Sequence, residues 1–190
     1  MDWEFIEDGH TIDPISIGLY AEDGRELYLI NRDVSIERMT SHPWLNPNVT
    51  RYLPLKREDG NRYTWDDNHP DYDRVVTRPE MRARVLRFFQ DTTDPRTWGY
   101  FAAHDQVTLA NLFGSFIQLP IGIPQRCNDT MQEWERLGQP MMPVQSSETQ
   151  HHALYDARFV MVQLTWLREC ERQQLAKRFQ AWKDGEQFPS

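Results

Sequence analysis

Four carboxylates and one histidine stand at three separate places in the chain where they could share one piece of chemistry. Asp2 and Glu4 lie near the N-terminus, Asp105 lies in the middle, and His151 and Asp156 lie five positions apart towards the C-terminus. Carboxylate oxygens are the ligands that hard divalent cations such as Mg²⁺ prefer, and an imidazole can take up a proton near neutral pH. Together they could hold metal ions and move a proton.

The pair Asp2 and Glu4 falls in a short apolar segment that predicts a strand. Residues two apart on a strand point to the same face, so the carboxylates would lie side by side while Trp3 and Phe5 turn into a core. Neighbouring carboxylates repel each other and serve no structural purpose unless a cation lies between them. The alternative is two solvated acids at a frayed end of the chain.

Asp105 stands where a predicted strand over 97–103 gives way to a predicted helix over 105–113. An aspartate in that place is often simply an N-cap, because its side chain accepts a backbone hydrogen bond in the first turn. Taken alone, the position therefore favours the N-cap over a role in chemistry.

His151 and Asp156 lie at the start of a helix predicted over 153–183. Aspartate is a poor helix former, and a carboxylate between apolar neighbours must be paired or bind a metal. His151 could be an ordinary loop histidine, and His152 competes with it for any chemical role.

The remaining pattern predicts an α/β layer fold with a mixed central sheet that starts as a three-strand antiparallel meander and is flanked by helices. Alternating apolar residues predict strands over 12–21 and 26–31, joined by the hairpin signal Asp23-Gly24. Further helices are predicted over 34–39 with Asp33 as N-cap, over 77–91 from a capping box at Thr77 and Glu80, and over 129–137. A single domain spans residues 1–190, with a polar loop or insertion at about 41–76.

Composition excludes several classes of protein. The 190 residues carry a net charge of −8, which argues against a protein that holds nucleic acid by bulk positive charge but not against an enzyme whose metal ions supply that charge. The two cysteines do not have the spacing of a metal site, and no apolar run is long enough to cross a membrane. The expectation is a soluble, cytoplasmic protein without a signal peptide or membrane contact.

In this order, Asp-x-Glu, a middle Asp and His-x4-Asp resemble the DEDD superfamily of 3′–5′ exonucleases, in its histidine-bearing branch (DEDDh). The match is closest to small actinobacterial and phage exoribonucleases of the ribonuclease-T-like group. The segments that carry it are 4–9 (EFIEDG), 15–18 (ISIG), 98–114 (WGYFAAHDQVTLANLFG) and 151–157 (HHALYDA). The resemblance covers most of the chain, least of all residues 41–76.

The resemblance implies a ribonuclease H-like fold and a metal-dependent 3′–5′ exoribonuclease that releases nucleoside 5′-monophosphates by a two-metal-ion mechanism. Asp2, Glu4, Asp105 and Asp156 would hold two Mg²⁺ ions, for which Mn²⁺ could substitute, and His151 would act as general base on the attacking water. It also implies a homodimer, to which the long C-terminal helix could contribute.

Substrate contacts are less sharply predicted. The resemblance places Phe5 at the terminal nucleotide, and Trp65, Tyr72 and Trp98 could stack on bases or simply pack in the protein. The basic stretch 168–183 could follow a phosphate backbone or be a solvated helix face.

Two alternative functions remain open. The same site could act on 3′ ends of single-stranded DNA, because no residue can be assigned to recognition of the 2′-hydroxyl. A non-catalytic protein that binds nucleic acid or a host component could also retain the fold.

Overall fold

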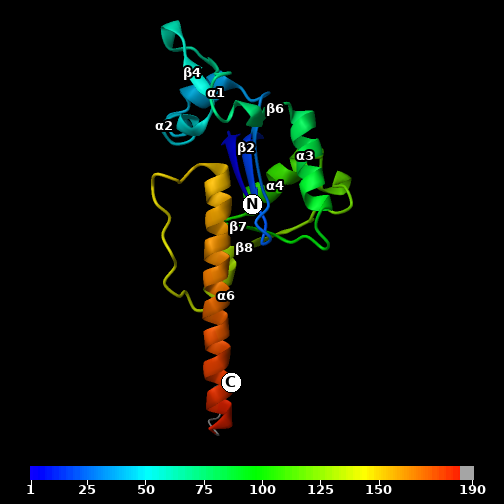
Figure 1. Cartoon of the computed structure of the whole chain (residues 1–190), viewed down its shortest axis with the longest axis vertical. Coiled ribbons are helices and arrows are strands. Elements are labelled where there is room, and N and C mark those ends of the chain that lie inside the picture. Colours follow the sequence, from blue (N-terminus) through cyan, green and yellow to red (C-terminus); the bar gives the residue numbers. More distant parts are fainter. Residues whose placement is uncertain (185–190) are drawn as a thin grey trace.

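The computed structural model describes residues 1–184 of the chain. A small β-sheet with helices on both faces forms the body, and one long helix runs past the body as a column (Figure 1). The architecture is α/β with a mixed sheet, as the sequence predicts.

The central sheet contains four strands: β1 (Asp2–Glu7), β2 (Ile12–Tyr20), β3 (Glu26–Asn31) and β6 (Val75–Val76). They are ordered β1-β2-β3-β6, and the pairings β1–β2 and β2–β3 are antiparallel while β3–β6 is parallel. The predicted antiparallel start is therefore confirmed. Strand β1 lies at the edge, so one side of its backbone has no partner within this sheet.

Helices α3 (Arg78–Gln90) and α4 (Ala103–Leu112) cover one face of the sheet. The capping box at Thr77 and Glu80 is formed, and Asp105 lies inside the first turn of α4 rather than before it. The core between these helices and the sheet is apolar throughout and includes Trp3, Ile17, Leu29, Met81, Val85, Phe89, Leu109 and Phe113.

The other face is covered by α1 (Ile36–Ser41), α2 (Leu45–Asn48) and the first turn of α6 (Ala153–Lys183). Helix α1 begins two residues later than predicted and is capped by Ser35. Asp33 instead accepts a hydrogen bond from the backbone N–H of Arg78, which explains why it does not cap the nearer helix.

The segment 41–76, predicted as a polar loop or insertion, contains short regular elements. Short elements follow one another in it: α2, the 3-10 turns η1 (Thr50–Tyr52), η2 (Asp59–Asn61) and η3 (Tyr72–Arg74), and the hairpin of β4 (Leu55–Arg57) with β5 (Tyr63–Trp65). Leu45, Val49 and Leu53 are buried in a second apolar core, which lies on the face of the sheet covered by α1 and α2, and Trp65 and Tyr72 pack against it. Both aromatic residues therefore serve packing, and apolar anchors among the prolines give the segment its order.

A second, two-stranded parallel sheet joins β7 (Thr97–Gly99) to β8 (Cys127–Asp129), with the turn η4 (Phe116–Gln118) between them and α5 (Thr130–Arg136) following directly. The strand predicted over 97–103 ends four residues early. Phe101 adopts a positive φ of 51°, and Asp129 accepts hydrogen bonds from the backbone N–H groups of Phe101 and Ala102. These contacts turn the chain sharply into α4.

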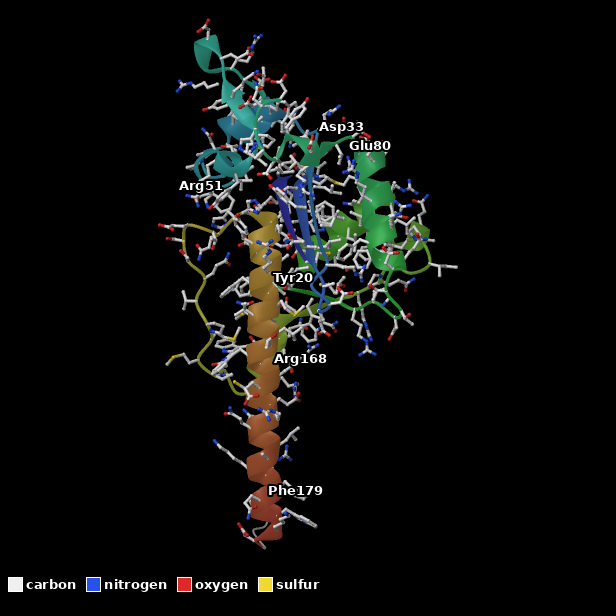
Figure 2. All side chains as sticks on the ribbon, viewed as in Figure 1. Tyr20, Asp33, Arg51, Glu80, Arg168 and Phe179 are labelled. Carbon is white, nitrogen blue, oxygen red and sulfur yellow. The ribbon has the colours of Figure 1, made fainter. Side chains whose placement is uncertain are left out.

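Helix α6 has the predicted bounds, and Phe179 marks its portion beyond the body (Figure 2). Within residues 1–184, no helix combines the length and the apolar character that a membrane crossing requires.

The start of α6 lies directly on β2. Gly18 makes this possible, because a Cβ at that position would lie 2.0 Å from the carbonyl oxygen of Ala153. Gly18 pairs with Asp2 across the strands, and Ser16 pairs with Glu4. The helix therefore begins on the same face of the sheet as the two carboxylates of β1.

We expect Gly18→Ala to lower the free energy of unfolding by about 3 kcal/mol, because the new methyl group meets backbone that cannot move aside. Gly9→Ala is the matched control: Gly9 has φ of 81° but no atom within 4 Å of the added carbon, so only local strain of about 1 kcal/mol is expected. Urea unfolding of both variants measures the difference, and equal values would show that the close approach at Gly18 is unimportant.

Candidate active site

A cleft of about 680 Å³ opens where the edge of β1 meets the first turns of α4 and α6. The loop between α5 and α6 closes one side of it. All five residues singled out for chemistry line this cleft: Asp2, Glu4, Asp105, His151 and Asp156. Residues separated by as much as 154 positions in the sequence are therefore neighbours in the fold.

Glu4, His151 and Asp156 form the tightest group. One carboxylate oxygen from each acid and one ring nitrogen of the histidine all lie within 4.8 Å of one another. Glu4 comes from β1, Asp156 from the first turn of α6, and His151 from the loop just before that helix, so the approach at Gly18 is what brings them together. This spacing lets the two carboxylates hold a cation between them while the imidazole lies close beside it.

Asp105 joins the group through the free edge of β1. Its Oδ1 accepts a hydrogen bond from the backbone N–H of Trp3 at 2.9 Å, a donor that has no strand partner. Beside it the Met1 amino group donates to the carbonyl oxygen of Trp98 at 2.9 Å. A Cβ at Gly99 would approach the Asp105 carboxylate to 3.2 Å, so the glycine keeps β7 close to the site. Asp105 is therefore not the N-cap of α4; its side chain instead binds the free edge of β1.

The carboxylates make one another hard to ionise. Burial raises the pKa of Asp2 well above its ordinary value, and the charges of Asp105, Glu4 and Asp156 raise it further. Burial and the charges of Asp156 and Asp105 raise the pKa of Glu4 to about 8. Burial raises the pKa of Asp105 to about 7, although the N-terminal ammonium and the Trp3 hydrogen bond oppose the rise.

Burial also raises the pKa of Asp156, against hydrogen bonds from Gln145 and His151. None of the ion pairs seen among residues 1–184 involves any of the four carboxylates. The residues that line the cleft include these four acids but no lysine or arginine. Such a donor set fits a divalent cation, because the cation supplies positive charge that the lining lacks.

His151 is held in an unusual conformation. Its backbone φ is 67°. Residues other than glycine seldom adopt this conformation, and where they do it often marks a functional site. Its backbone N–H donates to Asp156 Oδ2 at 2.8 Å, while Gln145 Nε2 donates to Asp156 Oδ1 at 2.5 Å. The His151 ring meets the indole of Trp44 edge to face, with ring centroids 4.8 Å apart.

His152 has a different environment from its neighbour. It is buried, and its ring packs against Tyr28 and Tyr155 with centroids 4.4 and 4.1 Å away. Burial lowers its pKa. Since it faces the core and is absent from the lining of the cleft, the geometry favours His151 for any reaction there.

The two proposed substrate contacts are placed differently. Phe5 lines the cleft, and its ring stacks on His104 with centroids 5.7 Å apart. Trp98 lies half-buried in β7, outside the lining of the cleft, and reaches the site only through its carbonyl oxygen.

Sequence reasoning missed several residues of the cleft. His104 directly precedes Asp105, and that adjacency is the one signal that could have found it. Tyr100 and Phe101 are exposed, and their rings meet edge to face with centroids 4.7 Å apart. Their position in the cleft was not predicted, because the sequence there predicts a strand. Met131 and Trp134 come from α5, which no pattern connected with the site.

The basic stretch 168–183 is partly neutralised. Arg168 forms an ion pair with Glu22, and Arg172 forms one with Glu169. Ion pairs of this kind compete with phosphate, so the structure offers the predicted phosphate track little support.

Comparisons with known proteins agree with the geometry. No family model matches the chain. Proteins named 3′-5′ exoribonuclease from two strains of Mycobacterium tuberculosis are each 36% identical to it over 159 residues, which cover 83% of this chain and 84% of theirs.

The raised pKa values predict how stability depends on pH. A carboxyl group with a folded pKa above its unfolded value stabilises the protein below the unfolded pKa, and this contribution is lost as pH rises through the folded value. For Glu4 that window runs from 4.5 to about 8. We therefore expect the Tm of the metal-free protein to fall across this range, and millimolar Mg²⁺ to raise Tm more at pH 8 than at pH 6.

Differential scanning fluorimetry with and without EDTA measures both effects. Glu4→Gln should flatten the pH dependence, whereas Glu7→Gln, at the exposed end of the same strand, should leave it unchanged. A Tm that is constant over this window, or an equal Mg²⁺ effect at both pH values, would contradict the electrostatic account.

Proposed function

Because this chain belongs to the family of 3′–5′ exoribonucleases, we propose that it shortens RNA from the 3′ end by a two-metal mechanism of the DEDDh kind. The products would be nucleoside 5′-monophosphates released one at a time. The observation that carries the proposal is the convergence of Asp2, Glu4, Asp105, His151 and Asp156 in one cleft.

The metal ions would be held by the four carboxylates. An all-oxygen set suits Mg²⁺, with Mn²⁺ as a substitute. The raised pKa values of these acids support the assignment, because they result in part from mutual repulsion of negative charges that a bound cation would neutralise. Divalent ions bound there would supply activation of the attacking water and neutralise charge that develops on the phosphate.

His151 would serve as the general base. Mg²⁺ takes oxygen ligands in preference to imidazole, so the ring nitrogen near Glu4 and Asp156 is left to accept a proton from the attacking water. The backbone hydrogen bond from His151 to Asp156 keeps the base beside the carboxylate cluster.

The 3′-terminal nucleotide would lie between the carboxylates and the aromatic side of the cleft. Phe5 and His104 already stack on each other, and Tyr100 and Phe101 present further exposed rings beside them. Stacking on aromatic rings is tolerant of base identity, which suits an enzyme that removes every nucleotide in turn.

The ribonuclease H-like fold is part of the proposal. It is supported by the strand order β3-β2-β1 and by the bond from Met1 to Trp98, which brings β7 to the free edge of β1. The homodimer implied by the resemblance stays a prediction.

A gel assay with 5′-labelled single-stranded RNA and the matching DNA tests the proposal directly. We expect a ladder that shortens from the 3′ end, that requires Mg²⁺ or Mn²⁺, and that forms faster on RNA than on DNA. Faster cleavage of DNA would favour the exodeoxyribonuclease alternative. Binding without cleavage under any metal condition would favour a non-catalytic role.

Substitutions at the site should change activity and stability in different directions. We expect Asp105→Asn to reduce kcat/KM by about a thousandfold or more, because a metal ligand is lost, while the metal-free protein becomes more stable at pH 8 through the loss of one repelling charge.

His151→Ala should reduce kcat far more than His152→Phe, which alters only core packing. An Asp105→Asn variant that keeps its activity, or the reverse order of the two histidine variants, would overturn the assignment.

A further inference from the structure

The loop that carries His151 has no regular secondary structure. Its residues 145–150 form hydrogen bonds with one another, and Gln145 also donates to Asp156. Residues 139–152 form neither helix nor strand between α5 and α6 (Figure 1). Its first part is hydrogen-bonded to α5 and α6: Trp134 Nε1 donates to the carbonyl oxygen of Pro140, and Trp166 Nε1 donates to that of Met141. Its last part, which leads into His151, is the part that must be held if the base is to keep its place.

The segment 44–52, from α2 through η1, contacts that last part. Tyr52 donates its hydroxyl to the carbonyl oxygen of Glu148 at 2.6 Å. Arg51 donates to the carbonyl oxygen of Ser147 at 3.2 Å and to that of Gln150 at 3.5 Å. Both side chains therefore bind main-chain carbonyl groups just before His151.

The two side chains also support each other. The Arg51 guanidinium lies 4.5 Å from the centroid of the Tyr52 ring and donates to the Tyr52 hydroxyl at 2.6 Å. The Tyr52 ring in turn meets His152 edge to face at 5.3 Å. Arg51 lies at the end of the segment that faces the loop (Figure 2).

Trp44 completes the contact on the histidine itself. Its indole meets the His151 ring, and it is 47% exposed. Segment 44–52 thus contacts residues 147–152 through main chain, through His152 and through the ring of His151.

We propose that Arg51 and Tyr52 are positioning residues that hold residues 147–151 so that His151 keeps its place beside Glu4 and Asp156. This inference rests on the proposed function. It also gives the segment 41–76 a purpose: its buried apolar anchors fix it to the sheet, and its outer side fixes the loop. A base displaced by about 1 Å can cost as much as a hundredfold in rate, so a few hydrogen bonds on an exposed loop can matter for catalysis while mattering little for stability.

The test is the double variant Arg51→Met, Tyr52→Phe, which removes the hydrogen bonds and keeps the tyrosine ring against His152. We expect kcat to fall about 10- to 100-fold while KM changes less than about twofold, because the aromatic side of the cleft is untouched. Hydrogen exchange of the metal-free protein should show faster exchange at amides 147–151 and unchanged exchange in the central sheet.

Arg38→Met is the matched control. Arg38 is also an exposed arginine near this end of the sheet, but it forms ion pairs with Asp8 and Asp13 and does not contact the loop. It should leave kcat and the exchange of residues 147–151 unchanged. The single variant Arg51→Met, which keeps Tyr52, should have a higher kcat than the double variant.

A double variant with the kcat and the loop exchange of the wild type would overturn the inference. Faster exchange throughout the central sheet would also overturn it, because the two residues would then serve general stability. A wild-type protein that cleaves neither RNA nor DNA would instead refute the proposed function, and the exchange experiment would still decide whether the loop is held by Arg51 and Tyr52.

Discussion

Repulsion among four carboxylates that share one cleft, two of them buried and two half-buried, is the constraint on which the rest of this structure depends. Glu4 and Asp105 are almost fully buried, and each acid raises the cost of ionising another. A protein gains nothing in stability by gathering such groups, since buried like charges oppose folding at neutral pH. The arrangement makes physical sense when the same charges are used to bind cations.

Several features of the fold serve to keep these acids together. The free edge of β1 leaves the Trp3 N–H available to Asp105. Gly18 allows the backbone of α6 to lie on β2, next to the strand that carries Glu4. Asp156 therefore lies close to Glu4. Covering the sheet on both faces limits solvent around the site, which strengthens both the repulsion and any attraction to a metal ion.

The sequence was sufficient for the parts of the protein where local pattern and tertiary structure agree. The antiparallel start, α3 with its capping box and the bounds of α6 follow from periodicity and turn residues. The shared cleft could be predicted only from a resemblance, because spacing alone does not bring together residues from three distant segments. The residues concerned are Asp2, Glu4, Asp105, His151 and Asp156. The turn at Phe101 could not be predicted, because it depends on hydrogen bonds to Asp129, 28 positions away. Segment 41–76 was predicted as a polar loop or insertion, but its short helices and hairpin were not, because their order comes from a few apolar residues packed on a distant sheet.

Proton release on metal binding tests the central claim most directly. Calorimetric titration of Mn²⁺ into the protein at pH 7, in buffers of different ionisation enthalpy, gives the number of protons released. Because the pKa of Glu4 is about 8 and that of Asp105 about 7, the account predicts release of about one proton or more per protein, with tighter binding at pH 8 than at pH 6. Binding without proton release, or an affinity that does not change with pH, would show that these carboxylates are not the metal ligands.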